Sequence, residues 1–260
     1  IMITWGDSLH SVMTDDEIGK LARTVVEHCQ GRAKVIAADN MWTTNKAVDY
    51  AKYCADLGAD FLMLLPPDWA GQTTPDSLVE HFNRVSEHIP TMLVTAFFVQ
   101  SGVRGGSFRM DTIRALYDRC PGLISVKDDI VGDFGIDLCS MVHEKWAVIS
   151  GGLMKNHMHQ VPYGVDGYLS LFMSFKPEIP HLYWQNIEDK NYEGAWEIIR
   201  EKERLITGKW QSGIGGFNPF VHGLMELYRV CGRHLPRPYH KLTDGKMKDL
   251  KDFMKSIDMY

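Results

Sequence analysis

The sequence predicts an α/β fold of the (β/α)8 TIM barrel type, in which parallel strands alternate with helices. Short apolar runs recur at intervals of about 30 residues, and stretches with helical amphipathic spacing lie between them. The apolar runs do not alternate with polar residues, as a strand with one solvent-exposed face would. Strands that are buried on both faces and joined by helices are typical of a parallel sheet.

The first predicted strand covers residues 1–4, which are apolar or β-branched and precede a turn at residues 6–8. Thr14-Asp-Asp-Glu17 has the pattern of a capping box, which predicts a helix that begins there and continues to Cys29. Because the chain opens inside a strand, we expect further residues, with one more βα unit, to precede Ile1.

The same unit of strand, loop and helix then repeats along the chain. The further strands are predicted at residues 34–38, 61–65, 91–96, 124–127, 147–150 and 167–170, and the helices at 45–57, 75–88, 110–119 and 135–144. Together with residues 1–4 they make seven strands. An eight-stranded barrel needs one more strand, which the upstream unit would supply. An open doubly wound sheet is the alternative, but its first βα loop usually carries a Gly-rich phosphate turn, which residues 5–8 do not match.

After Ser174 the pattern changes to helices only. They are predicted at residues 182–186, 192–207, 219–231 and 244–257. The chain is therefore expected to divide into a barrel over residues 1–175 and a helical part over residues 176–260, which includes a C-terminal helical extension.

Composition and charge exclude several classes of protein. The chain has 260 residues, of which 45% are hydrophobic and 23% are charged, and its formal net charge is −5. Since no window is rich in Lys or Arg, neither nucleic acid nor an anionic membrane is an expected partner. The five cysteines are odd in number and contain no CxxC pair, which favours reduced thiols in a cytoplasmic protein. No apolar run has membrane-spanning length, and no metal or cofactor is predicted.

The active site of such a barrel lies where strands end and loops begin, at the carboxyl edge of the sheet. The polar and aromatic residues that follow the predicted strands are therefore the candidates for function. They are Thr4, Trp5, Asp7, Asp39, Asn40, Asp68, Trp69, Thr95, Gln100, Lys127, Asp128, Asp129, Ser150 and Ser170.

Lys127 is the only lysine among these candidates that directly follows an apolar run at a strand end. In a dry barrel mouth the ammonium form of lysine is disfavoured, which frees the amine to attack a carbonyl and form an imine. The alternative is a lysine that extends to the rim or pairs with Asp128 or Asp129, because structural ion pairs also occupy such positions.

A series of short motifs supports the catalytic interpretation by its order along the chain. The series is Thr4-Trp-Gly-Asp-Ser8, Thr14-Asp-Asp-Glu17, Gly58-Ala-Asp60, Ile89-Pro90, Ile124-Ser-Val-Lys127, Val148-Ile-Ser-Gly-Gly152, Gly164-Val-Asp-Gly167 and Phe217-Asn-Pro219. It resembles the dihydrodipicolinate synthase and N-acetylneuraminate lyase family from that family's second strand onward.

The resemblance implies class I chemistry, in which Lys127 forms a Schiff base with pyruvate or a related 2-oxo acid. It also implies that Thr4 keeps one hydroxyl of the motif that holds the substrate carboxylate, while Trp5 replaces the second and Asp7 stands for a glutamate. Thr4 is therefore expected to act beside Lys127 in catalysis, on the substrate carboxylate or in the proton relay. Trp5 and Trp69 are expected to shape the pocket. Thr95, Ser150 and Ser170 complete the predicted substrate contacts, and the resemblance implies a homotetramer or dimer.

The largest departure from the family follows the strand at residues 91–96. The family places there a tyrosine on which proton transfer depends, whereas this chain has Val94-Thr-Ala-Phe-Phe98. Thr95 and Gln100 are candidates for part of this proton relay, and the alternative is that they make ordinary hydrogen bonds within the loop. The leading hypothesis is a lyase that acts on 2-oxo acids, either an aldolase or a sugar-acid dehydratase. The alternative is a degenerate member that binds a small acid or a protein partner without turnover.

Two other features carry weaker predictions. His157-Met-His159 offers two imidazoles but no third ligand at metal spacing. The segment around Arg104, between Ser101 and Gly106, has the composition of an anion-binding loop, although a plain surface loop is favoured.

Overall fold

The computed structural model describes residues 1–4, 6–68, 71–100 and 106–260. They form two compact units. Unit 1 consists of residues 1–151 and 159–167, and unit 2 of residues 152–158 and 168–260. Each unit has a hydrophobic core of its own.

Six strands form one sheet whose spatial order follows the chain order. They are β1 (Ile36–Ala38), β2 (Phe61–Leu64), β3 (Thr91–Val94), β4 (Leu123–Asp128), β5 (Ala147–Ser150) and β6 (Gly167–Tyr168). The pairings from β1 to β5 are all parallel, so the predicted β/α repeat is confirmed. The described strands run in linear order and do not show the closed eight-stranded barrel that the sequence predicts.

Residues 1–4 lie beside β1 but form only a bridge. Met2 pairs in parallel with Ile36, whose amide donates to the Ile1 carbonyl at 2.9 Å and whose carbonyl accepts from Ile3. The amide of Ser8 then donates to the carbonyl of Thr4 at 3.2 Å, which starts the predicted turn. The strand expected here is thus reduced to one parallel bridge at the edge of the sheet.

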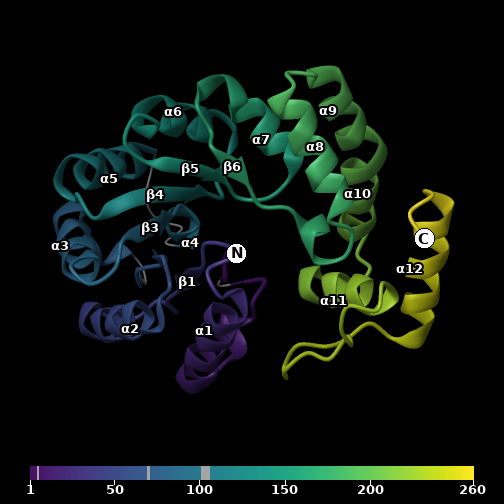
Figure 1. Ribbon diagram of the computed structural model, residues 1–260, viewed down its shortest axis with the longest axis horizontal. Coiled ribbons are helices and arrows are strands. Elements are labelled where there is room, and N and C mark those ends of the chain that lie inside the picture. The colour runs from purple at the N-terminus through teal and green to yellow at the C-terminus, as the bar shows by residue number, and fades with distance from the viewer. Residues whose placement is uncertain (5, 69–70, 101–105) are drawn as a thin grey trace. The chain divides into compact units, whose positions relative to one another are not determined.

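Helices cover the outer side of the strands of unit 1, as Figure 1 shows for α1, α2, α3, α5 and α6. The helical elements of this unit are η1 (His10–Val12), α1 (Asp15–Cys29), α2 (Thr44–Leu57), α3 (Pro75–Ser86), α4 (Phe97–Gln100), α5 (Gly106–Arg119), α6 (Gly132–Val142) and η3 (Val161–Tyr163). The capping box predicted at Thr14 and Glu17 is confirmed, and a second one joins Thr74 to Ser77 at the start of α3.

The central strands β2, β3 and β4 are mostly buried on both faces, which explains their apolar pattern. All four residues of β3 are buried, and Leu62, Leu64 and Val126 on the neighbouring strands have no exposed surface. Each such side chain contributes about 1.5–3 kcal/mol by leaving water. This burial holds the carboxyl ends of β3, β4 and β5 at fixed positions.

Unit 2 is mostly helical, as predicted for the part of the chain after Ser174. Its elements are α7 (Met154–Gln160, whose last two residues belong to unit 1), η4 (Leu171–Ser174), α8 (Glu178–Glu188), α9 (Tyr192–Ile198), the π-helical turn η5 (Ile199–Glu203), α10 (Arg204–Gln211), α11 (Phe217–Leu227) and α12 (Asp244–Ser256). The helix expected at residues 192–207 is therefore interrupted by a π-helical turn.

Glu203, the last residue of that turn, caps a helix far away in the sequence. Its carboxylate accepts hydrogen bonds from the amides of Met154, at Oε2, and Lys155, at 3.0 Å, in the first turn of α7. Glu203 is only 4% exposed, and burial raises its pKa above the ordinary 4.5, against the lowering effect of these hydrogen bonds. A buried carboxylate thus replaces a local N-cap for α7.

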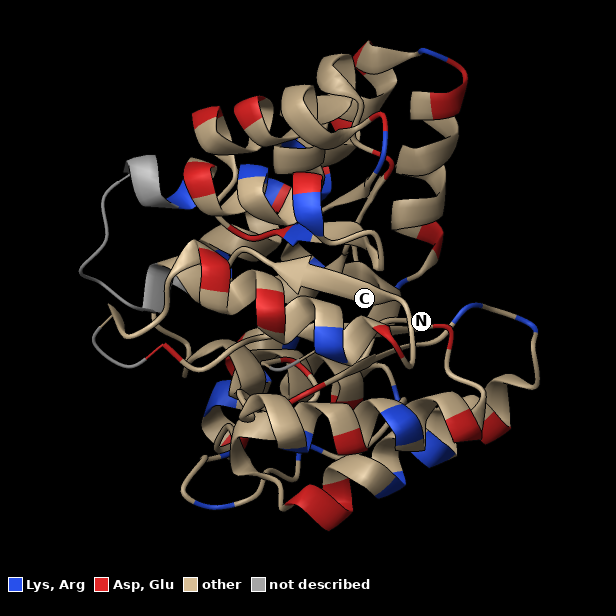
Figure 2. Cartoon of the chain, turned by 90° about the vertical axis from the view of Figure 1, so that its left-hand side faces the viewer, with Lys and Arg blue, Asp and Glu red and all other residues tan. Residues whose placement is uncertain are grey.

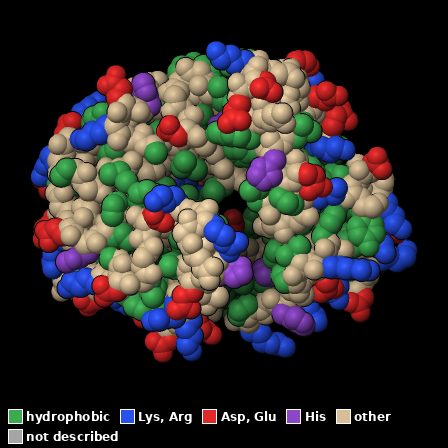
Figure 3. Space-filling view, in the orientation of Figure 1, with side chains coloured by type: hydrophobic (Ala, Val, Ile, Leu, Met, Phe, Trp, Pro, Cys, Tyr) green, Lys and Arg blue, Asp and Glu red, His purple; other side chains and the backbone are tan. Residues whose placement is uncertain are grey.

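Charged residues of both signs are spread over the surface. Figure 2 shows Lys and Arg interspersed with Asp and Glu along the helices, and Figure 3 shows the same mixture on its visible face. In the described residues, no helix has both the length and the apolar character needed to cross a membrane.

Candidate active site

Lys127 is the penultimate residue of β4, in the middle of the sheet. It pairs with Val94 on β3 and with Ile149 on β5, and its side chain keeps only 11% of its surface exposed. The predicted position of a lysine at the carboxyl end of a buried strand is therefore confirmed.

The Lys127 ammonium group donates to both carboxylate oxygens of Asp129. The distance from Nζ to Oδ2 is 2.5 Å, and Oδ1 is also in hydrogen-bonding contact. Burial raises the pKa of Asp129 above the ordinary 3.8, while the charge and hydrogen bonds of Lys127 lower it and the charge of Asp128 raises it. Of the two ion pairs left open by the sequence, the structure contains the one with Asp129.

Asp7 adds a second carboxylate to the same electrostatic environment. Although the residue as a whole is exposed to solvent, the protein around its carboxylate raises the pKa above 3.8 by desolvation. The charge of Lys127 lowers this pKa and that of Asp129 raises it. One cation thus interacts with two carboxylates that come from separate loops.

Asp128, unlike Asp129, has its carboxylate hydrogen-bonded to the residues that support the site. It has no exposed surface, and Oδ1 accepts hydrogen bonds from the Thr95 hydroxyl at 3.0 Å and from the amides of Ile130 and Val131. Oδ2 accepts from Nε2 of Gln160 at 2.7 Å. Oδ1 therefore holds the loop after β4, and Oδ2 binds the end of α7.

Thr95 binds the same loop from the end of β3. Its hydroxyl oxygen accepts from the amide of Asp129 at 2.8 Å and from that of Ile130 at 3.3 Å, in addition to its bond to Asp128. These contacts support the alternative that Thr95 is a loop hydrogen-bonder, and they fix the backbone that carries Asp129.

Gly151 and Gly135 lie next to the carboxylates of Asp129 and Asp128, where a larger residue would clash. A Cβ atom on Gly151 would lie 1.9 Å from Oδ1 of Asp129 and 2.6 Å from the carbonyl oxygen of Asp128. A Cβ on Gly135 would lie 2.4 Å from Oδ2 of Asp128 and 2.2 Å from Nε2 of Gln160. At Gly151 a larger residue would displace backbone as well as the Asp129 side chain, whereas at Gly135 the side chains of Asp128 and Gln160 would have to shift. Neither role is predicted from the sequence.

Thr4 and Ser150 place unpartnered hydroxyl groups inside unit 1. Thr4 is 8% exposed and Ser150 is fully buried, and within the described residues neither hydroxyl has a hydrogen-bond partner. Ser150 lies opposite Asp128 in the pairing of β4 with β5. Because an unsatisfied buried hydroxyl is unfavourable, these two groups are suited to receive a polar ligand.

Other predicted residues have structural contacts. Oδ1 of Asp39 accepts from the amide of Leu65 at 2.9 Å, and burial raises the pKa of Asp39 to about 7. Asp68 accepts from the backbone amide and the hydroxyl of Thr73 at 2.8 and 2.9 Å, and the side-chain Nδ2 of Asn40 donates to the carbonyl of His10.

The remaining predicted residues are not joined to Lys127 by any described geometry. Trp5, Trp69 and Arg104 lie outside the described residues, as does the side chain of Gln100. Ser170 belongs to unit 2, where it precedes η4.

The histidine pair expected as a weak metal candidate lies on α7. Nδ1 of His157 is 2.8 Å from the Tyr183 hydroxyl, which donates to the carbonyl of Met154 at 3.1 Å, and His157 packs against the ring of Tyr168. Among the residues described, no group of three or more His, Cys, Asp or Glu side chains is arranged to hold a metal ion. His157 is part of a buried aromatic cluster.

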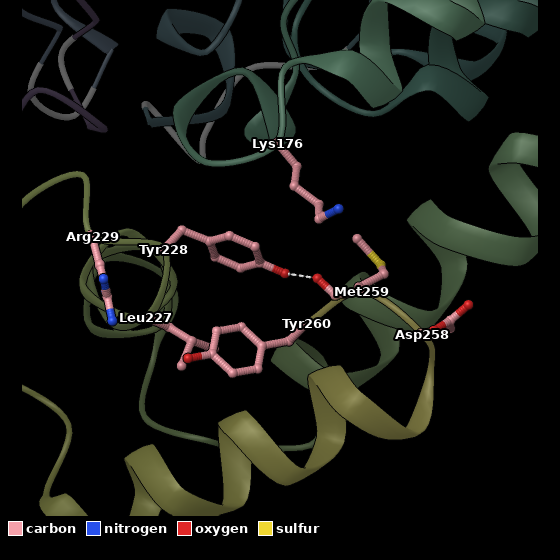
Figure 4. A pocket seen from close by; sticks show the side chains of 7 residues that line it. All are labelled: Lys176, Leu227, Tyr228, Arg229, Asp258, Met259 and Tyr260. Carbon is pink, nitrogen blue, oxygen red and sulfur yellow. Dashed lines mark hydrogen bonds between the residues drawn. The ribbon is translucent and has the colours of Figure 1, made fainter.

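A cavity of about 530 Å³ is present elsewhere, among the C-terminal elements of unit 2. Figure 4 shows that the ring of Tyr228 borders it, with its hydroxyl bonded to the carbonyl of Met259, and that the ring of Tyr260 lies beside it. No residue predicted to act in catalysis or substrate binding lines this cavity.

Unit 1 is thus an α/β unit in which a lysine and a carboxylate meet at the carboxyl end of a central parallel strand. The sequence from residue 4 to residue 257 matches the model of the dihydrodipicolinate synthetase family, and the chain belongs to that family.

Curated relatives carry the names of synthases and dehydratases. The chain is 26% identical to 4-hydroxy-tetrahydrodipicolinate synthase of Clostridium tetani, over 66% of this chain and 57% of that protein. It is 28% identical to the probable 5-dehydro-4-deoxyglucarate dehydratase of Methylobacterium radiotolerans, over 73% of this chain and 61% of that protein. The matched part of this chain therefore spans about six tenths of the length of these relatives.

Solved structures share the fold at lower identity. Dihydrodipicolinate synthase from Aquifex aeolicus has a TM-score of 0.80 at 19% identity, covering 100% of this chain and 86% of that one. The N-acetylneuraminate lyase of Fusobacterium nucleatum has a TM-score of 0.76 at 15% identity, covering 94% and 81%. YagE from E. coli K12, solved in complex with pyruvate, has a TM-score of 0.77 at 16% identity, covering 96% and 84%.

Proposed function

We propose that the chain is a lyase that acts on a 2-oxo acid, as an aldolase or a dehydratase, through an imine formed on Lys127. Membership of the dihydrodipicolinate synthetase family supports the reaction class. We also propose that the sheet belongs to a (β/α)8 barrel and that the protein forms a homo-oligomer. Both are implied by the resemblance.

The observation that carries the proposal is the position of the Lys127 amine. It lies at the carboxyl end of β4, mostly shielded from water, in contact with a carboxylate that can take up its proton. An amine must lose its proton before it attacks a carbonyl carbon. A lysine whose only task was to neutralise a surface charge would not require a buried strand end.

The remaining residues have binding roles in this proposal. The hydroxyl groups of Thr4 and Ser150, which have no partner within the described part of the chain, bind the carboxylate or carbonyl oxygen of the substrate. Trp5 and Trp69 shape the pocket, and Ser170 supplies a further contact. These assignments rest on the order of the motifs and on the need to satisfy buried polar groups.

Reductive trapping tests the proposal directly. The protein is incubated with pyruvate and borohydride, digested, and examined by mass spectrometry for an adduct on the peptide that contains Lys127. We expect an adduct in the wild-type protein and none in Lys127→Arg, because arginine keeps a positive charge beside Asp129 but forms no imine. If no compound of a 2-oxo acid panel modifies Lys127, the proposed chemistry is wrong.

A second candidate function is binding of a small acid or a partner without turnover. The end of β3 favours it, because Thr95, Phe97 and Phe98 are buried where the family has its tyrosine, and the Thr95 hydroxyl is engaged in the loop. Retro-aldol or dehydratase turnover that disappears in Lys127→Ala would exclude this candidate.

A further inference from the structure

We propose that Asp129 is the acid–base residue of this site and moves the protons of imine formation at Lys127. The inference rests on the proposed function, since it concerns the same lysine. Nζ of Lys127 contacts both carboxylate oxygens of Asp129, at 2.5 Å for Oδ2. No other described carboxylate has a hydrogen bond to this amine.

The position of the Asp129 carboxylate is fixed from two sides. Its backbone amide donates to the Thr95 hydroxyl at 2.8 Å, and Oδ1 lies against the Cα of Gly151, where a Cβ would come within 1.9 Å. A group held in place by packing and backbone hydrogen bonds loses little entropy when it transfers a proton. The loop after β4 is therefore built to present this carboxylate to the amine.

The neighbouring polar groups are less suited to the same task. Both oxygens of Asp128 are occupied by four donors, and the Thr95 hydroxyl already donates to Asp128. Asp129 keeps 22% of its side chain exposed, whereas Asp128 has no exposed surface. Asp7 acts on the pair through its charge.

The proton transfers balance without any further reagent. The Asp129 carboxylate takes a proton from the Lys127 ammonium, and the neutral amine forms a C–N bond to the carbonyl carbon as the C=O π electrons move to oxygen. Asp129 gives its proton to that oxygen and takes one from the nitrogen. It then protonates the hydroxyl group, which leaves as water, and the protonated imine and the Asp129 carboxylate remain.

The test measures the rate of imine formation with pyruvate, trapped by borohydride on Lys127, as a function of pH. Asp129→Asn keeps the size and an oxygen acceptor but cannot take up a proton. Loss of a general acid–base group slows a reaction by about 100-fold or more, and this is the expected effect. The decrease in trapping rate at acidic pH that protonation of the Asp129 carboxylate causes is also expected to disappear. The charged groups facing Asp129 are Lys127, Asp128 and Asp7, all of which the variant retains.

Two further variants separate catalysis from structure. Asp129→Ala leaves space for a formate ion, and added formate is expected to restore much of its trapping rate. Asp133→Asn makes the same chemical change at an exposed position on α6 and is expected to leave the rate unchanged.

The outcomes distinguish this inference from the proposed function. If Asp129→Asn is trapped at the wild-type rate, or is slowed equally at every pH while formate does not rescue Asp129→Ala, Asp129 is not the acid–base residue. In both cases imine formation at Lys127 stands. If the wild-type protein gives no adduct, both ideas fail together.

Discussion

Gln160, at the end of α7, donates a 2.7 Å hydrogen bond from Nε2 to Oδ2 of Asp128, which lies 32 positions earlier in the chain. Asp128 is fully buried and its other oxygen receives three donors from the strand end and the loop. The bond thus connects the strand end that carries Lys127 to a second segment of unit 1.

Asp128→Asn tests the importance of this connection. Both oxygens of Asp128 accept hydrogen bonds, but an asparagine side chain has only one oxygen and one NH2 group. In either orientation its NH2 group would therefore face at least one of these donors, and that hydrogen bond would be lost. We expect the free energy of unfolding to fall by about 2 kcal/mol. Urea denaturation provides the measurement, and the exposed Asp133→Asn serves as control with a change below about 0.5 kcal/mol. Equal stability of both variants would contradict the framework role.

Gly151→Ala tests the steric requirement beside Asp129. The added Cβ would lie 1.9 Å from Oδ1 of Asp129 and 2.6 Å from a backbone oxygen, so the carboxylate or the loop must move. A loss of about 1–3 kcal/mol is expected, with slower trapping of pyruvate on Lys127. In Gly208→Ala the new Cβ meets no atom within 4 Å, and in this helix it is expected to stabilise by up to about 1 kcal/mol. Unchanged stability and trapping in Gly151→Ala would refute the close approach.

Glu203→Ala removes the cap of α7. The amides of Met154 and Lys155 lose their acceptor, and a decrease of about 2 kcal/mol in the free energy of unfolding is expected. Glu201, which is exposed on the same π-helical turn, provides the matched control, Glu201→Ala. Thermal unfolding of the two variants should differ by several degrees. Identical melting would show that the buried carboxylate contributes no net stability.

His157 is expected to make the protein sensitive to acid. Burial lowers the pKa of His157 from 6.5 to about 4, so below pH 6.5 the unfolded chain binds a proton that the native state excludes. Stability is therefore lost as the pH falls from about 6.5 to about 4. His157→Gln should reduce this slope in urea denaturation measured across the window. His181→Gln, at an exposed position of α8, should keep it; a slope unchanged in both variants would argue against the shifted pKa.

Local sequence signals predicted the framework of unit 1 well. The strands are marked by unbroken apolar runs, and Thr14 with Glu17 carries its own capping box, so no distant residue is needed to recognise them. The same applies to Lys127, whose place at a strand end follows from the run before it. The apolar run alone does not distinguish Asp128 from Asp129 as the partner of Lys127. Alternation along a strand would have favoured Asp129, because side chains two apart share a side.

Signals that depend on distant residues were missed. The sequence gives α7 no local cap, since its first amides are satisfied by Glu203 in another helix. The demand for glycine at position 151 comes from a side chain that approaches from the end of β4. Nothing in the sequence around Gln160 indicates that its side chain will bind Asp128, because the two residues meet only in the folded protein. Such relationships arise from tertiary packing, which spacing in the sequence does not encode.

The distance along the chain between α7 and its cap also sets an order of events during synthesis. Met154 leaves the ribosome 49 residues before Glu203. At about 5–20 residues per second, Glu203 follows Met154 after roughly 2–10 s. During that interval the first turn of α7 has only water to satisfy its amides. A nascent chain stalled before Glu203 emerges would therefore present this helix uncapped, and a binding factor that recognises free amide groups would have several seconds to engage it.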